Sequence, residues 1–312
     1  MRYDELKEIV IRAFNLSDAK LLTRIAEVNQ IVVARVLSES LHEDLLDSII
    51  ERDPESSVKL YRLVRWKLNE RARALFRSLL SKVILRRSRI LVSLLGENGK
   101  ARHYGRYEIG DEFEVELTIE SLISSGKSID HMSYDDVIAI KRRKRKGGLV
   151  IMLDASGSMS GSKILRAATT AAIASYFVDK GELSVIGFNN RAFFIKSIND
   201  KKNIMKVVEE ILDIVPIGYT NMYDALRLAL EEGKKLRNPS YILLTDGEYN
   251  VGGDPHTLAE KMRLNVIYLS GNRNRGSRIC RELAEAGGGK YYEVRDVRMI
   301  PNILTELLSY WS

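Results

Sequence analysis

Residues 149–159 read LVIMLDASGSM, and this stretch decides how the rest of the chain is interpreted. A run of apolar residues leads directly into an acid, Asp154, which is followed by hydroxyl side chains at Ser156 and Ser158. A short apolar run that ends in polar turn residues is typical of a strand buried on both faces of a sheet. The stretch therefore predicts a buried strand that delivers oxygen ligands for a cation.

The sequence after Asp154 alternates between helical and strand-like segments. We expect helices over residues 163–180, 203–215, 222–236, 257–263 and 277–286, a final helix after residue 294, and strands over 183–188, 192–195, 241–245, 266–270 and 290–294. Apolar strands separated by helices predict a mostly parallel sheet that is covered on both faces. The fold class is therefore α/β, a doubly wound, mostly parallel, Rossmann-like sheet occupying residues 148–312.

The sequence before this sheet has a different pattern. Residues 1–95 carry apolar side chains at helical spacing, with a break at Asp53-Pro54, and predict a mainly helical N-terminal domain. Residues 96–147 form a connecting region. Within it, residues 111–117 alternate like a strand, but their continuation, 118–123, fits a helix equally well, so both assignments stay open.

Composition narrows the setting and the partners. The chain has 312 residues, of which 45% are hydrophobic and 29% charged, and a net charge of +7. No apolar run approaches the about 20 residues of a membrane span, and the start of the chain is acidic, so we expect a cytoplasmic protein without a membrane span. Basic residues cluster in 59–89 and 141–146. Such blocks bind nucleic acid, bind an acidic protein partner, or form a solvated helix face.

Three loops are expected at the edge where the parallel strands end, which is where ligands bind in open α/β sheets. They carry Asp154, Ser156 and Ser158, then Thr220, then Asp246. Carboxylates and hydroxyls with no soft ligand suit a hard cation such as Mg²⁺. We expect Ser156 and Ser158 to bind directly and Asp154 directly or through water. Asp246 would hold the metal's waters, and Thr220 would enter or leave the coordination shell as a ligand arrives.

The same loops lack what a hydrolase would need. Met159 occupies the position of the nucleophile in the pattern G-x-S-x-G, and no His lies in any site loop, so a Ser-His-Asp mechanism has no base. A phosphotransferase using Asp154 would be expected to have a second carboxylate where Ser156 stands. Residues 157–163 also depart from the phosphate-binding loop pattern. We therefore expect no independent enzymatic activity.

Residues 148–312 closely resemble the von Willebrand factor A (VWA) domain. The resemblance rests on the residues of its metal-ion-dependent adhesion site (MIDAS), listed here as Asp154, Ser156, Ser158, Thr220 and Asp246. It implies a mostly parallel sheet with helices on both sides and a site for Mg²⁺, with Mn²⁺ or Ca²⁺ as alternatives. It also implies a protein partner whose acidic side chain completes the coordination of the metal.

The rest of the chain is similar to intracellular prokaryotic CoxE-like proteins, which work beside MoxR-type AAA+ ATPases. This similarity lies in residues 110–119, in 135–137 and in the basic run before the strand. It implies that the helical half docks an ATPase or a client. The alternative is an RNA-binding protein of Ro-like architecture that uses its basic helical region, although the aromatic residues there are spaced more for helix packing than for base stacking.

Overall fold

The structure is a computed structural model of the whole chain, and it describes residues 3–39, 42–93, 103–107, 112–141, 147–159, 162–178, 182–269 and 274–308. The chain divides into two compact units. One consists of Met1–Val92 together with Lys146–Ser312, and the other is Ser93–Arg145. Each unit is described by itself.

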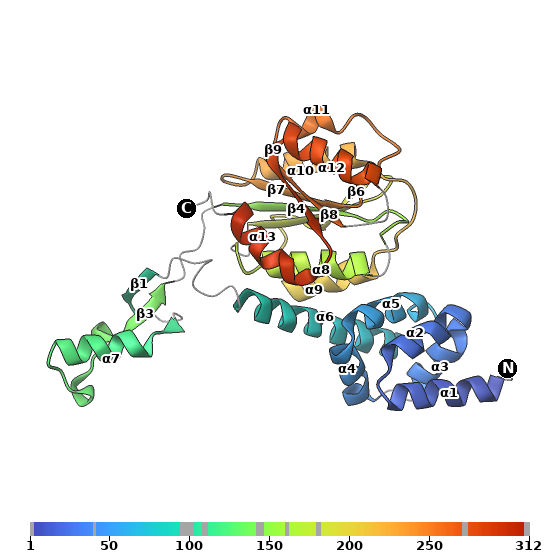
Figure 1. The fold of residues 1–312 in the computed structure, drawn as a ribbon, viewed down its shortest axis with the longest axis horizontal. Coiled ribbons are helices and arrows are strands. Elements are labelled where there is room, and N and C mark those ends of the chain that lie inside the picture. Colours follow the sequence, from blue (N-terminus) through green and yellow to red (C-terminus); the bar gives the residue numbers. More distant parts are fainter. Residues whose placement is uncertain are drawn as a thin grey trace. The chain divides into compact units, whose positions relative to one another are not determined.

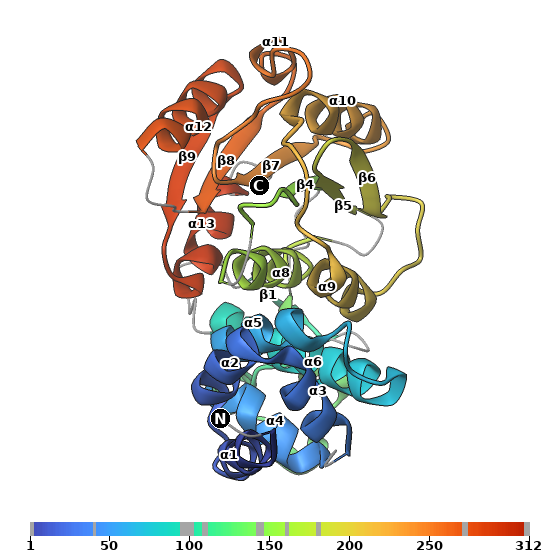
Figure 2. The same cartoon turned by 90° about the vertical axis from the view of Figure 1, so that its right-hand side faces the viewer.

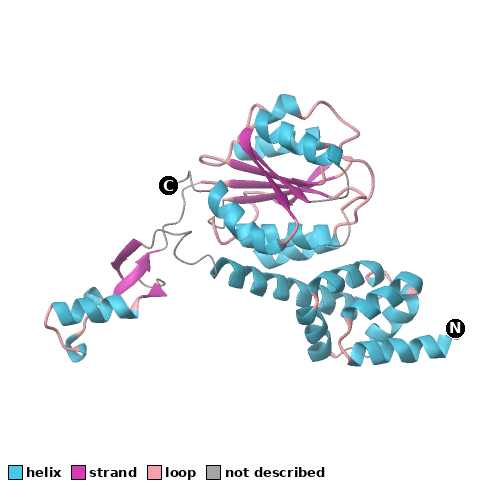
Figure 3. Ribbon diagram, viewed as in Figure 1, coloured by secondary structure: helices cyan, strands magenta, loops and turns pink. Residues whose placement is uncertain are grey.

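A six-stranded sheet forms the centre of the larger unit (Figures 1 and 3). Its strands are β4 (Leu149–Asp154), β5 (Leu183–Phe188), β6 (Ala192–Lys196), β7 (Ser240–Thr245), β8 (Leu264–Leu269) and β9 (Gly288–Val294). The strand order is β6-β5-β4-β7-β8-β9, and every neighbouring pair is parallel except β5 and β6. The four strands β4, β5, β7 and β8 are buried along their whole length, as their continuous apolar runs predict.

Helices cover both faces of this sheet (Figure 2). On one face lie α8 (Ser162–Ala174), α9 (Ile204–Asp213) and α13 (Ile300–Leu307), and on the other lie α10 (Met222–Gly233), α11 (His256–Ala259) and α12 (Asn274–Ala286). Side chains of β4 such as Val150 and Met152 share one apolar core with Met222 and Leu226 of α10. The predicted doubly wound, mostly parallel α/β fold is confirmed.

The predicted helical N-terminal region is also observed. Its helices are α1 (Tyr3–Asn15), α2 (Ala19–Val28), α3 (Gln30–Glu39), α4 (Glu43–Arg52), α5 (Pro54–Val64) and α6 (Glu70–Ser93). The predicted break at Asp53-Pro54 is where α5 begins, because the Asp53 carboxylate accepts a hydrogen bond from the Ser56 backbone N–H at 3.1 Å. Helix α5 packs against both α8 and α9 of the sheet layer.

The smaller unit contains a small sheet that the sequence analysis did not predict. Strands β1 (His103–Arg106), β2 (Glu112–Phe113) and β3 (Ile138–Lys141) pair antiparallel in the order β1-β3-β2. They accompany α7 (Val115–Ser124) and two short 3₁₀ helices, Ile129–His131 and Tyr134–Asp136. The ambiguity over residues 111–123 is thus resolved into a strand of two residues followed by a helix.

The structure bears only in part on the predicted domain limits and on the predicted absence of a membrane span. The domain boundary at residues 95 and 96 and most of the basic block 141–146 lie outside the described residues, and the domain limits stay a prediction. Within the described parts of the chain, none of the helices combines the length and the apolar character needed to cross a membrane.

Candidate metal centre

The candidate site lies where the order in which the chain adds strands to the sheet reverses. The chain runs outward from β4 through β5 to β6, and it later runs the other way from β7 through β8 to β9. Strands β4 and β7 are parallel neighbours, with Leu153 opposite Leu244. Loops that follow two such strands leave in opposite directions and open a crevice at their carboxyl ends. Asp154 and Asp246 therefore lie at the ends of adjacent strands.

Asp154 is buried at the end of β4 and is held by neutral donors. Its Oδ1 accepts a hydrogen bond from the Ser156 backbone N–H at 2.9 Å, and its Oδ2 accepts one from Thr245 Oγ1 at 2.7 Å. Burial raises the pKa of Asp154 to about 6, although these hydrogen bonds act in the opposite direction. The negative charge of a buried carboxylate that is held by neutral donors is stabilised by a positive ion at contact distance.

The two serines of the first loop bring their hydroxyl groups together. Ser156 Oγ and Ser158 Oγ lie 3.1 Å apart, and the turn between them is closed by a hydrogen bond from the Met159 N–H to the Ser156 carbonyl oxygen at 3.0 Å. Ser156 is buried, whereas Ser158 is exposed. The loop therefore presents two adjacent neutral oxygens at the edge of the sheet, one deep and one open to solvent.

Thr220 is positioned by asparagines from two other loops. Its backbone N–H donates to Asn250 Oδ1 at 2.9 Å, and the next residue, Asn221, donates its N–H to the Asn189 carbonyl oxygen at 2.8 Å. The turn after β5 also holds the first loop, because the Phe188 carbonyl oxygen accepts from the Ala155 N–H at 2.7 Å. Neighbouring carbonyls of one turn thus fix both the Asp154 loop and the Thr220 loop.

Gly218 lets the Thr220 loop fold closely over this turn. Its φ of +84° lies in the left-handed region, and a Cβ added there would stand 2.5 Å from Asn190 Oδ1. The same Asn190 oxygen accepts a hydrogen bond from the Tyr219 N–H at 2.6 Å. A side chain at position 218 would displace the segment that leads directly into Thr220.

Asp246 follows β7 and has two oxygens in different surroundings. Oδ2 accepts a hydrogen bond from Lys163 Nζ at 2.8 Å, whereas Oδ1 is buried and has no hydrogen-bond partner among the described residues. The next residue, Gly247, has a φ of +82°, and a Cβ there would collide with the Gly276 backbone. Its N–H donates to Thr245 Oγ1 at 3.0 Å, which completes a chain of hydrogen bonds from Gly247 to Asp154.

These residues fit a divalent cation. The donors are two carboxylates and neighbouring hydroxyls, which are the oxygen ligands that hard cations prefer. The strongest sign is Asp246 Oδ1, which has no partner in the part of the chain that the structure describes. A buried carboxylate oxygen left without a donor is costly unless an ion or a water binds it. Asp154, Ser156 and Ser158 would hold the ion from one loop, with Thr220 and Asp246 from the others. This assignment of ligands stays a prediction.

Soft-metal chemistry does not suit the same place. Cys280 in α12 is buried, and burial together with the charges of Asp246 and Asp154 raises the pKa of its thiol, which keeps the thiol protonated. The described residues contain no cluster of three or more His, Cys, Asp or Glu side chains that could hold a metal. A cation held here depends on serine and threonine hydroxyls.

The sequence did not predict the residues that support the site. These residues contact others far along the chain, and no local sequence pattern predicts such contacts. They are Lys163, Asn189, Asn190 and Asn250. The backbone N–H of Asp224 donates to Asn221 Oδ1 at 3.0 Å as part of the helix cap, but its carboxylate bonds elsewhere. It accepts the Ala192 N–H at 2.8 Å and pairs with Arg227 at 2.7 Å, which ties α10 to β6.

Several basic residues of segment 59–89 make contacts within the protein. Arg65 donates to the carbonyl oxygens of Leu212 and Ile214, at 2.9 and 3.2 Å, and Arg77 bonds to Asp213 at 2.5 Å. Other members of the segment pair with acids of the helical region: Lys59 with Glu27 and Arg86 with Glu51. The contacts of Arg65 and Arg77 favour packing roles for these two residues, and no observation supports the RNA-binding alternative.

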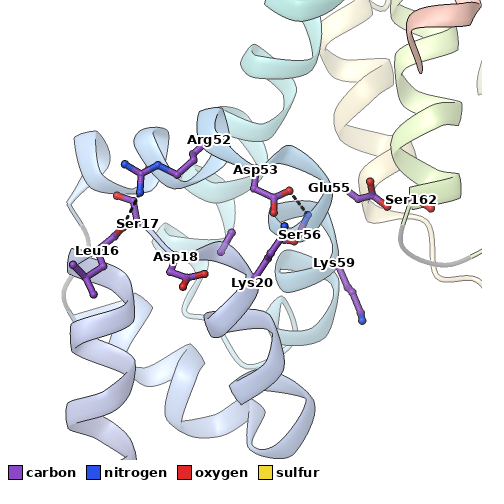
Figure 4. A pocket seen from close by; sticks show the side chains of 11 residues that line it. Leu16, Ser17, Asp18, Lys20, Arg52, Asp53, Glu55, Ser56, Lys59 and Ser162 are labelled. Carbon is purple, nitrogen blue, oxygen red and sulfur yellow. Dashed lines mark hydrogen bonds between the residues drawn. The ribbon is translucent and has the colours of Figure 1, made fainter. Parts of the chain in front are cut away.

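A depression of about 830 Å³ lies where α1, α2, α4 and α5 approach the start of α8 (Figure 4). Its charged lining is mixed, with Lys20, Arg52 and Lys59 alongside Asp18, Asp53 and Glu55. Asp18 and Asp53 cap the helices that follow them, accepting the backbone N–H groups of Leu21 and Ser56. The depression therefore lacks a free set of polar groups for one kind of ligand.

Fold and site together define a class of protein: a doubly wound α/β domain whose switch-point loops carry carboxylates and hydroxyls for a divalent cation. The chain belongs to the von Willebrand factor type A domain family, which matches residues 148–306. Domains of this family are metal-binding modules for protein interaction, and they bind a divalent metal at the adhesion site named MIDAS.

Known proteins resemble the chain over part of its length. An uncharacterised protein of Methanocaldococcus jannaschii is 31% identical over 119 residues, which span 36% of this chain and 27% of that protein. Among solved structures, a von Willebrand factor type A protein from Catenulispora acidiphila is 20% identical, with a TM-score of 0.43 over 56% of this chain and 44% of that one. Proximal thread matrix protein 1 from the mussel byssus, solved with a zinc-occupied MIDAS motif, is 16% identical, with a TM-score of 0.41 over 52% and 47%.

Proposed function

We propose that this protein is a metal-dependent adaptor. Its VWA domain would hold Mg²⁺ through Asp154, Ser156, Ser158, Thr220 and Asp246, and the bound cation would capture an acidic side chain of a protein partner. The observation that carries the proposal is the buried Oδ1 of Asp246, for which the described residues offer no donor. Lys163 links Asp246 to the loop that carries the paired serine hydroxyls. Mn²⁺ and Ca²⁺ are alternative occupants.

The electrostatics of the site support capture of an acid. A cation held by few carboxylates and several neutral oxygens stays electrophilic, so a further carboxylate is attracted to it. Helix α10 adds to this attraction, because it begins directly after the Thr220 loop, with Asn221 as its N-cap. The positive end of that helix dipole favours a negative group at this edge.

The wider setting extends the proposal. The resemblance of residues 110–119 and 135–137 to CoxE-like proteins supports a MoxR-type AAA+ ATPase as a working partner, with the helical region as the docking surface for the ATPase or its client. The adaptor would act in the cytoplasm, in the assembly or remodelling of a protein complex, and would have no enzymatic activity of its own.

The test uses Ser158→Ala in the full chain. Ser158 is exposed, so its replacement leaves the packing intact while removing one oxygen from the site. Partners are captured from native lysate on the wild-type chain with Mg²⁺, released with a chelator and identified. We expect Ser158→Ala to capture much less of the released partner, and a partner variant with its contacting Asp or Glu changed to the amide to behave in the same way.

Ser121→Ala is the matched control, because Ser121 is an exposed serine of α7 in the smaller unit. It should capture as much partner as the wild type. Capture that persists in chelator and in Ser158→Ala would show that binding does not use the metal, and the proposal would be wrong.

A further inference from the structure

Lys163 lies in the first turn of α8, and its ammonium group contacts the candidate metal centre. Its Nζ donates to Asp246 Oδ2 at 2.8 Å and to the Ser158 carbonyl oxygen at 3.2 Å. The side chain of Lys163 is 15% exposed and that of Asp246 only 9%. An ammonium group so placed contacts two of the three predicted ligand loops and belongs to the site rather than to the open surface.

Because of this contact, the two oxygens of the Asp246 carboxylate have different roles. Oδ2 is fixed by Lys163, so the carboxylate is held in one orientation. Oδ1 then remains as the buried oxygen for which the described residues offer no donor. In metal sites, groups that bind a ligand's second atom commonly set its orientation and strength. Lys163 is placed to do this for Asp246.

We propose that Lys163 sets the cation affinity of the site, by neutralising Asp246 through Oδ2 while leaving Oδ1 to the coordination shell of the cation. The inference rests on the proposed function. Asp154 and Asp246 bring two negative charges to the centre, and Lys163 offsets one of them. The fixed positive charge weakens binding of a divalent cation, so a bound cation retains its attraction for a further carboxylate.

The test compares cation binding by the wild type, Lys163→Met and Lys163→Arg, measured by calorimetric titration of the full chain with Mg²⁺ alone. Met keeps an unbranched apolar stem and removes the charge. We expect Lys163→Met to bind Mg²⁺ about tenfold more tightly, because a nearby like charge is removed from a partly buried site. Lys163→Arg keeps the charge and should stay close to the wild type.

Lys261→Met is the matched control. Lys261 is exposed and precedes β8, at the edge of the sheet opposite the candidate centre, and its replacement changes the net charge by the same amount. Its Mg²⁺ affinity should equal that of the wild type. A merely structural role for Lys163 would lower the melting temperature of Lys163→Met without tightening cation binding, and that result would overturn the proposal.

A second readout separates electrostatics from changes in shape. Tb³⁺ has nearly the radius of Ca²⁺ and one more charge, so removing a fixed positive charge should favour it more strongly. If Lys163→Met tightens Ca²⁺ tenfold, we expect about thirtyfold for Tb³⁺, since the Coulomb energy scales with charge. Equal gains, or losses, for the two ions would contradict the proposal. A wild type that binds no divalent cation would instead remove the proposed function itself.

Discussion

Two groups of acidic side chains in the larger unit differ in their partners: Asp213 in α9, and Asp154 and Asp246 at the candidate metal centre. Asp213, at the end of α9, receives Tyr61 OH on Oδ1 at 2.6 Å and Arg77 Nη1 on Oδ2 at 2.5 Å. At the candidate metal centre, Asp154 is bonded only to neutral donors, and Asp246 keeps a buried oxygen with no partner among the described residues. The acid that joins the helical region to the sheet layer has a donor on each oxygen and a guanidinium partner. Among the described residues, the two acids at the strand ends have one contacting cation between them, the ammonium group of Lys163 on Asp246.

The contrast separates an acid that stabilises from acids that bind. Burial and the hydrogen bond to Asp213 raise the pKa of Tyr61, so the phenol stays a neutral donor, and the guanidinium of Arg77 supplies the opposite charge. At Asp154 burial dominates and raises the pKa to about 6. Lys163 offsets only one of the two negative charges at the strand ends, and the remaining buried charge favours binding of an external cation.

The largest effect is expected where the carboxylate that is bonded to neutral donors loses its charge. Asp154→Asn keeps the shape of the side chain and an acceptor for the Ser156 N–H, but it removes a full negative charge from the centre. Changes to hydrogen-bonding groups around metal ligands typically cost about 10 to 100-fold in affinity where the group, unlike the Lys163 ammonium, does not repel the cation. Loss of a full ligand charge should therefore cost about a thousandfold in Mg²⁺ affinity. Calorimetric titration with Mg²⁺ measures this.

Asp254→Asn provides the comparison, because Asp254 is an exposed acid paired with His256. It should bind Mg²⁺ like the wild type. A similar Mg²⁺ affinity in Asp154→Asn would mean that the acids at the strand ends are structural after all, and the contrast with Asp213 would disappear.

The next effect is on stability and comes from the satisfied cluster. Arg65 is buried and donates to the carbonyl oxygens of Leu212 and Ile214, which flank Asp213. Arg65→Met leaves both carbonyls without these donors, and we expect a loss of about 2 to 3 kcal/mol in the free energy of unfolding. Urea denaturation measures it, with the exposed Arg71→Met as the control.

Mg²⁺ binding by Arg65→Met tests whether the Asp213 cluster and the metal centre are independent. Folded Arg65→Met should bind Mg²⁺ as the wild type does, since Arg65 contacts none of the predicted ligands. A large fall in Mg²⁺ affinity would show that the helical region and the metal centre act as one cluster rather than two.

Local patterns were sufficient for the sheet and for the residues at its edge. The apolar runs of β4 and β7 are buried throughout, and each ends at a predicted site loop. Such strands can be predicted because consecutive residues determine both the burial of a strand and its end. The small sheet of the other unit was missed for the opposite reason. Its strands have four, two and four residues, too short to show a period, and they pair across a helix.

The partners of the acids could not be predicted in the same way. Tyr61 lies 152 positions from Asp213, and Lys163 lies 83 positions from Asp246. Nothing in segment 59–89 distinguishes Arg65 and Arg77, which bind α9, from the neighbouring basic residues that stay on the surface. Which acid is satisfied depends on packing between elements, and only the folded chain contains that information.

The smallest effect tests how completely Asp213 is satisfied. Tyr61→Phe removes the hydroxyl group bonded to Asp213 Oδ1 but keeps the ring, whose edge-on contact with Phe76 has a centroid distance of 5.3 Å. We expect a loss of about 1 kcal/mol in the free energy of unfolding, because Arg77 still holds the other oxygen. Tyr134→Phe, which alters an exposed tyrosine, should leave stability unchanged.

A double-mutant cycle decides whether this loss belongs to the Asp213 cluster. In an Asp213→Ala background the Tyr61 hydroxyl has no carboxylate to bind, so adding Tyr61→Phe should cost nothing further. An undiminished cost in that background would assign the hydroxyl to another partner. Asp213 would then be left with one internal donor group, closer to the acids at the metal centre than its present contacts indicate.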